Sequence, residues 1–76
     1  GTRFIQVQRN LPGELGRLNE VFAKNGANIG GQYYRTQGEI GYVVLDSDGA
    51  MAPAQADDIV RQVRALDGTV RARVLM

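Results

Sequence analysis

The chain has 76 residues, with nine Lys and Arg against eight Asp and Glu, and it contains neither His nor Cys. Without these two residue types it lacks an imidazole general base, a thiolate nucleophile, a disulfide and the usual ligands of a transition-metal site. Its net charge of +1 is too balanced for nucleic-acid binding by bulk charge, and its apolar runs are too short for a membrane span. We therefore expect one small globular domain, of a size that often gains stability from a partner.

The chain does not begin with Met, so Gly1 and Thr2 are expected to be linker residues or a remnant of cloning in a domain over residues 1–76. The lack of Cys favours a cytoplasmic location. Asp57 and Asp58 are the only adjacent carboxylates. They fall near a predicted helix start, where negative charge complements the helix dipole, so we expect no catalytic residue, metal site or bound cofactor.

The first predicted element is a strand over residues 3–8. Ile5 and Val7 point to one side of it and Gln6 and Gln8 to the other, which is typical of a half-buried strand.

A helix is predicted to follow, because Pro12 fits a first helical turn. Glu14 in its first turn and Lys24 in its last complement the helix dipole, and Asn25-Gly26 is a helix stop. The spacing of the apolar residues forms one stripe, made of Leu15, Leu18, Val21 and Phe22.

Two strands are predicted over residues 28–36 and 39–46, joined by a hairpin turn at Gln37-Gly38. The second of them is apolar on both faces, as in a central strand.

Pro53 begins a second predicted helix, which ends at Asp67-Gly68 and has an apolar stripe of Ala56, Ile59, Val60, Val63 and Leu66. The last predicted strand covers residues 69–76. Val70, Ala72 and Val74 are expected to point inward on it, and Arg71 and Arg73 outward.

The predicted order is therefore βαββαβ, an α+β ferredoxin-like fold. Two right-handed crossovers give a four-stranded antiparallel sheet with both helices on one face. The spatial order of the strands should be 4-1-3-2, which places residues 28–36 on an edge.

The loop over residues 8–13 carries the most specific candidate site. It delivers backbone N–H groups to a helix N-terminus, where a carboxylate or phosphate is favoured. The amides of Gln8 and Asn10 both donate and accept hydrogen bonds, which suits a zwitterionic amino acid. Asn before a helix is often only a cap or turn residue, and Asn28 could likewise only satisfy a turn.

Two alternative functions are compatible with the same fold. An RNA-binding sheet would present aromatic residues such as Phe4 and Tyr42 for base stacking, but the third strand lacks the basic residue and second aromatic of that signature. An acylphosphatase-like enzyme would use an Arg and an Asn, here Arg9 and Asn28, but the loop lacks the glycines of an anion cradle.

Tyr33 and Tyr34 on the edge strand favour pairing with a second copy.

The motifs together resemble an ACT domain, and more narrowly the C-terminal regulatory domain of the serine-inhibited bacterial D-3-phosphoglycerate dehydrogenases. They are NLPG at residues 10–13, NI at 28–29, QYYRT at 32–36, IGYVVLD at 40–46 and GTVRAR at 68–73. The resemblance covers essentially the whole chain.

This resemblance implies a domain without chemistry of its own that binds L-serine between two ACT domains, whose edge strands pair into one eight-stranded sheet. NAD-dependent oxidation belongs to the catalytic part of such an enzyme, outside this chain. The implied effector-binding residues are Gln8, Asn10, Leu11, Pro12, Gly13 and, from the partner domain, Asn28.

The family has a histidine where this chain has Gln8, and an amide can hydrogen-bond but carries no charge. We therefore expect an allosteric regulatory domain that binds L-serine or another small amino acid as a homodimer. The alternative is an assembly module that dimerises and has lost serine binding with Gln8.

Overall fold

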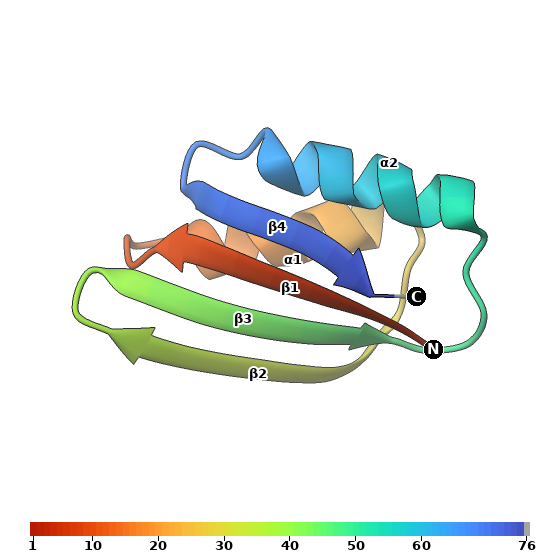
Figure 1. Cartoon of the computed structure of the whole chain (residues 1–76), viewed down its shortest axis with the longest axis horizontal. Helices are drawn as coiled ribbons and strands as arrows, with labels where there is room; N and C mark the ends of the chain where they lie inside the picture. The colour runs from red at the N-terminus through yellow and green to blue at the C-terminus, as the bar shows by residue number, and fades with distance from the viewer. Residues whose placement is uncertain (76) are drawn as a thin grey trace.

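The computed structural model describes residues 1–75, and its elements follow the predicted order βαββαβ. The four strands form one antiparallel sheet in the order β2-β3-β1-β4, with both helices on one face (Figure 1). This confirms the predicted fold and strand order. The elements are β1 (Thr2–Arg9), α1 (Glu14–Lys24), β2 (Ile29–Gln37), β3 (Ile40–Ser47), α2 (Pro53–Arg64) and β4 (Thr69–Leu75).

The helix ends depend on a few residues with a defined backbone role. Gly13 adopts a left-handed conformation with φ 83°, so α1 begins at Glu14, two residues after Pro12. The prediction that α1 starts at Pro12 was wrong by two residues, because the left-handed Gly13 separates Pro12 from the helix. Pro53 opens α2 as predicted, but α2 ends at Arg64 rather than at Asp67-Gly68.

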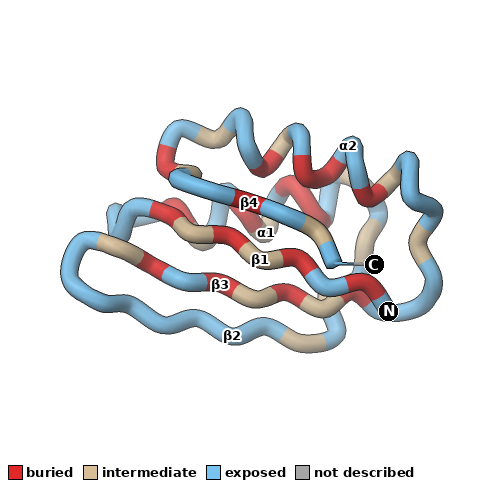
Figure 2. The backbone as a smooth tube through the Cα atoms, in the orientation of Figure 1, coloured by how far each residue is buried: buried red, intermediate tan, exposed pale blue. Residues whose placement is uncertain are grey.

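The core lies between the sheet and the two helices, where buried residues of β1, β3 and β4 face those of α1 and α2 (Figure 2). Phe4 and Phe22 pack edge to face, with ring centroids 4.9 Å apart. Both predicted helical stripes point into this core, with Leu15 and Leu66 at its margin. The buried apolar residues are Phe4, Leu18, Val21, Phe22, Val43, Leu45, Ala56, Ile59, Val60, Val63 and Ala72.

The buried face of β1 is the one that carries glutamines. Phe4 faces the helices, and because side chains alternate along a strand, Gln6 and Gln8 face them too. Ile5 and Val7 lie on the open face of the sheet. The alternation was predicted correctly, but the burial of Phe4 also removes it from the open face, where an RNA-binding sheet would need an aromatic residue.

The first half of β4 differs from the prediction because of a bulge. Val7 pairs with Arg71 and Gln8 with Thr69, so Val70 is the extra residue and has no partner on β1. Val70 is therefore 57% exposed rather than inward. After the bulge the predicted alternation holds, with Ala72 buried and Arg73 exposed. Met76, the predicted end of this strand, lies outside the described residues.

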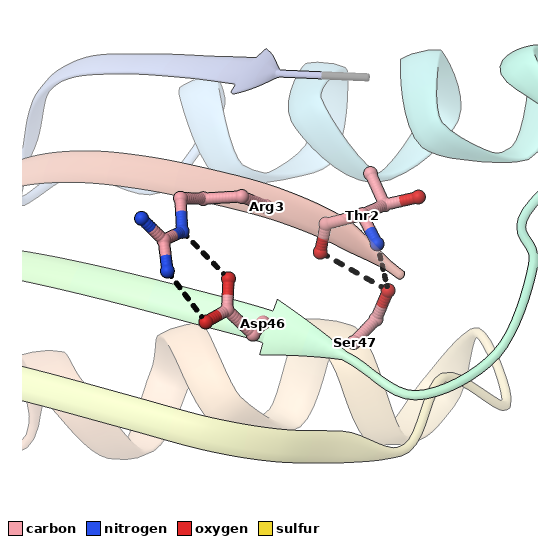
Figure 3. A network of polar contacts seen from close by, with 4 residues as sticks. All are labelled: Thr2, Arg3, Asp46 and Ser47. Atoms are coloured by element: carbon pink, nitrogen blue, oxygen red, sulfur yellow. Dashed lines mark hydrogen bonds and ion pairs between the residues drawn. The ribbon is translucent and has the colours of Figure 1, made fainter.

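The start of β1 is tied to the end of β3 by two polar contacts (Figure 3). Arg3 donates two hydrogen bonds to the carboxylate of Asp46, at 2.8 and 2.9 Å. These hydrogen bonds and the opposite charge raise the pKa of Arg3 and lower that of Asp46. The Ser47 hydroxyl accepts a hydrogen bond from the Thr2 backbone N–H and donates one to its carbonyl, so Thr2 is a buried member of β1.

Candidate functional site

The loop between β1 and α1 is held by backbone hydrogen bonds from both sides. The N–H of Arg9 donates to the carbonyl of Gly68, just before β4, and the N–H of Asn10 donates to the carbonyl of Glu39, just before β3. Both distances are 2.8 Å. The loop therefore has a fixed position at one end of the sheet, and Leu11, 52% exposed, projects from it.

The side chain of Asn10 joins the loop to β2. Its Nδ2 donates to the carbonyl of Gly38 at 3.2 Å, and its Oδ1 accepts from the Tyr34 hydroxyl at 3.2 Å. Asn10 is thus positioned beside the edge strand β2. Tyr34 contacts this predicted site residue directly, although the sequence indicated only an edge-strand aromatic.

The first turn of α1 offers free backbone donors. The first N–H groups of a helix have no partner within it. That of Glu14 donates to the carbonyl of Leu11, but no described residue caps α1 with its side chain or accepts from Leu15 or Gly16. Pro12 and Gly13 are exposed at this end. These N–H groups and the helix dipole favour a negatively charged ligand group.

Gln8 lies inside the molecule rather than on the exposed loop. It is 0% exposed, and neither of its amide atoms has a hydrogen-bond partner among residues 1–75. It packs over Gly41 on β3: a Cβ at that position would lie 3.2 Å from Gln8 Cγ and 3.0 Å from Tyr34 Cε1. Gly41 therefore makes room for both side chains, and the hydroxyl of the same Tyr34 reaches Asn10.

Glu14 is the second buried polar residue of this region. Its side chain is 5% exposed, with Oε1 3.5 Å from Arg17 Nη1, and Oε2 has no partner within the described part of the chain. A Cβ on Gly68 would overlap this carboxylate, so Glu14 lies against the segment that enters β4. The sequence predicted only a helix-dipole role for Glu14. The signal available for it was its place at the first residue of α1, directly after the N-cap Gly13.

Asn28 lies at the opposite end of the sheet. Its carbonyl accepts from the N–H of Asp48, beyond the end of β3, and its side chain is exposed. The nine residues of β2 separate it from Gly38, and ten residue steps at about 3.3 Å each amount to roughly 33 Å. One copy of the chain therefore cannot bring Asn10 and Asn28 to one ligand.

A hollow of about 440 Å³ opens beside the loop. Its lining combines one positive and one negative side chain with an amide and three apolar residues: Arg9, Glu39, Asn10, Leu11, Ile40 and Val70. The bulge contributes to it by exposing Val70. Gln8 and Glu14 do not line this hollow. The buried polar side chains and the hollow are therefore two separate features at the same end of the molecule.

Neither of the two helices described in residues 1–75 has the length and apolar character of a membrane span. The same residues contain no group of three or more His, Cys, Asp or Glu that could hold a metal ion. Asp57 and Asp58 are exposed on α2, and Asp58 pairs with Arg61 one turn later.

The fold and the loop at the N-terminus of α1 define a ferredoxin-like domain with a candidate ligand site at one end of its edge strand. Residues 4–71 match the family model described as the AHAS small subunit-like ACT domain. The chain belongs to this family of ACT domains.

The sequence relatives belong to one enzyme. The chain is 39% identical over 75 residues to D-3-phosphoglycerate dehydrogenase of Escherichia coli (strain K12), covering 99% of this chain and 18% of the relative. It is 38% identical over 73 residues to the enzyme of Haemophilus influenzae, covering 96% and 17%. The matched region is the C-terminal part of the dehydrogenase. The chain thus spans less than a fifth of these relatives.

Solved structures agree on the fold. The ACT domain from GTP pyrophosphokinase of Chlorobium tepidum superposes with a TM-score of 0.84 at 15% identity, covering 97% of this chain and 95% of that one. A homoserine dehydrogenase from Thiobacillus denitrificans gives 0.73 at 16% identity, covering 97% and 16%. At these identities the likeness shows the fold alone.

Proposed function

We propose that this chain is an allosteric regulatory domain that binds a small amino acid, with L-serine as the first candidate, between two of its copies. In this proposal it regulates an NAD-dependent D-3-phosphoglycerate dehydrogenase of serine biosynthesis, in the cytoplasm. The family match and the identity to the C-terminal part of that enzyme support the regulatory role. The NAD site and the oxidation itself belong to the catalytic part.

The observation that carries the proposal is the placement of Asn10 and Asn28 at opposite ends of an unpaired edge. All of β2 except Ile29 and Gly31 is exposed. Two β2 strands that pair antiparallel about their midpoint, Tyr33, place Asn28 of the second copy opposite Gly38. Gly38 is the residue whose carbonyl accepts from Asn10. Pairing therefore completes a two-asparagine site at each end of the new interface.

The same end of the molecule fits both charged groups of an amino acid. The ligand's carboxylate would lie at the free N–H groups of Leu15 and Gly16, where the helix dipole is favourable. The amides of Asn10 and of the second copy's Asn28 supply donors and acceptors for the remaining polar groups. A ligand held by both copies would bridge them.

Regulation follows from this bridging. An effector shifts a conformational equilibrium only by its difference in affinity for the two states. A ligand that contacts both copies binds best when β2 pairs with β2, so it favours that orientation. Domains attached to the two chains would then be held in one arrangement.

A second candidate, an assembly module without a ligand, is favoured by one observation. Gln8 occupies the position of the family's histidine and is fully buried, so it cannot reach an exposed ligand without a side-chain movement. In this alternative the chain dimerises through β2 and serves only to hold subunits together.

Titration of the 76-residue chain with L-serine, followed by calorimetry, separates these candidates. We expect saturable heat at one ligand per interface end, which Asn28→Ala removes and which Gln8→His strengthens. Sedimentation of the same samples reports whether the dimer is intact. An intact dimer that gives no heat with serine or any other small amino acid would refute the sensor and leave the assembly module.

A further inference from the structure

We infer that Glu14 and Gln8 bind the ammonium group of the ligand, so that the domain selects α-amino acids over carboxylates that lack an amine. This inference rests on the proposed function and assigns one part of the same site. Its evidence is a cluster of buried polar atoms beneath the first turn of α1, which the fold does not satisfy.

The cluster has a defined place. Gln8 pairs with Thr69 across β1 and β4, and Gly68, the residue before, lies directly against the carboxylate of Glu14. Gln6, two residues before Gln8 on the same buried face, donates from Nε2 to the Thr69 hydroxyl at 2.7 Å. The side chains of Gln6 and Glu14 therefore contact the Gly68–Thr69 segment at the start of β4, and Gln8 is paired with the same segment through the backbone.

Four atoms of this cluster are buried without a hydrogen-bond partner in residues 1–75. They are Gln6 Oε1, Gln8 Oε1, Gln8 Nε2 and Glu14 Oε2. Buried polar groups in native proteins are almost always hydrogen-bonded, and an unpaired one needs an explanation. Four such atoms in one place indicate a polar group that binds among them.

The chemistry of the four atoms specifies that group. Three are oxygens that accept, one is an amide nitrogen that donates, and the carboxylate of Glu14 carries a negative charge. A ligand that fits must have several donors and a positive charge, as a protonated amine does. An isolated phosphate or carboxylate would be repelled. The free N–H groups of Leu15 and Gly16 have the opposite preference, so the first turn of α1 presents an acceptor-rich side and a donor-rich side.

Access to the cluster passes Tyr34. Its ring lies with Gln8 over Gly41, at the β2 side of the cluster, and its hydroxyl donates to Asn10. Tyr34 is 42% exposed, so its ring can move toward solvent without leaving a core position. This movement would free Asn10 Oδ1 and uncover Gln8 at the edge where the second copy pairs.

The test compares Glu14→Gln with Glu20→Gln in the full 76-residue chain. Both residues are on α1, but Glu20 is exposed and makes no ion pair in the described structure. The ligands are L-serine, 3-hydroxypropionate, which lacks the amine, and ethanolamine, which lacks the carboxylate. Calorimetry measures affinity, and circular dichroism and sedimentation verify the fold and the dimer of each variant.

We expect Glu14→Gln to weaken serine binding at least tenfold with fold and dimer intact, Glu20→Gln to change it less than twofold, and 3-hydroxypropionate to bind at least tenfold more weakly than serine. Equal binding by Glu14→Gln and wild type would overturn the inference and leave the proposed function standing. Loss of binding in Glu39→Gln instead would overturn it too, because the ligand would then lie in the hollow beside the loop. A wild-type chain that binds no amino acid would overturn both.

Discussion

Replacement of Gln8 by Leu tests the structure in both stability and function. Gln8 is 0% exposed and its two amide atoms have no partner in residues 1–75. A buried unpaired polar group costs about 1–3 kcal/mol. Leu has a similar size and no polar atom, so Gln8→Leu should stabilise the chain by about that amount. For a domain of 60–100 residues each kcal/mol corresponds to roughly 4–8 °C, so Tm should rise by on the order of 5–20 °C.

The assay is thermal unfolding at one fixed protein concentration, because pairing of copies makes Tm depend on concentration. Gln37→Leu is the matched control, since Gln37 is exposed at the end of β2. We expect it to move Tm little. Gln8→Leu should also abolish amino-acid binding, so the stabler variant is the inactive one. A lower Tm for Gln8→Leu would mean that the amide is satisfied in the folded chain, and would refute the reasoning about this cluster.

Three further changes probe the packing and the charges. Gly41→Ala places a Cβ 3.0 Å from the Tyr34 ring, so it should lower the free energy of unfolding in urea by about 1–3 kcal/mol. It should also shift the ring signals of Tyr34 in NMR, and unchanged signals would contradict this contact. Leu18→Ala removes a fully buried core side chain and should lower the free energy of unfolding by about 2–5 kcal/mol, measured from the urea midpoint. Leu75 is 43% exposed, so Leu75→Ala should change that free energy by no more than about 0.5 kcal/mol. Arg3 lowers the pKa of Asp46, so wild type should be more stable than Asp46→Asn at pH 7. This difference in the free energy of unfolding should vanish as the pH falls below about 4, where the carboxylate becomes protonated. A difference that grew in acid would contradict the lowered pKa.

Much of the fold could be predicted because local signals agree with each other. The stripe of Leu18, Val21 and Phe22 and the glycine after Asn25 specify α1, and Pro53 specifies the start of α2. Their alternation with four predicted strands leaves few topologies, because the crossovers that join parallel strands of one sheet, here β1 to β2 and β3 to β4, are right-handed.

The buried face of β1 could not be predicted from hydrophobicity alone. One face carries Ile5 and Val7, and the other carries Phe4 with two glutamines. The choice depends on the contact of Phe4 with Phe22, which is long-range. The bulge at Val70 could not be predicted either, because it is defined only by the pairing of β4 with β1. Both features depend on how strands pair and pack, which tertiary structure decides.

The candidate site stays a prediction, and only the positions of its residues can be compared with the structure. Asn10 lies in the loop between β1 and α1, and Asn28 lies directly before β2, at the other end of that strand. Glu14 and Tyr34 were missed because their relation to Gln8 depends on space at Gly68 and Gly41. A sequence reports the presence of a glycine but not which side chain fills the space above it.

The central claim, a ligand site shared between two copies, is tested most directly by complementation. Asn10→Ala and Asn28→Ala each remove one half of every site in their own homodimer, so neither should bind L-serine. Mixed in equal amounts and allowed to exchange, half of the dimers are hybrids with one intact site, which restores about a quarter of the wild-type binding capacity. Calorimetry of the mixture should recover this fraction at wild-type affinity. No recovery, in a mixture shown by sedimentation to be dimeric and exchanged, would contradict the shared site.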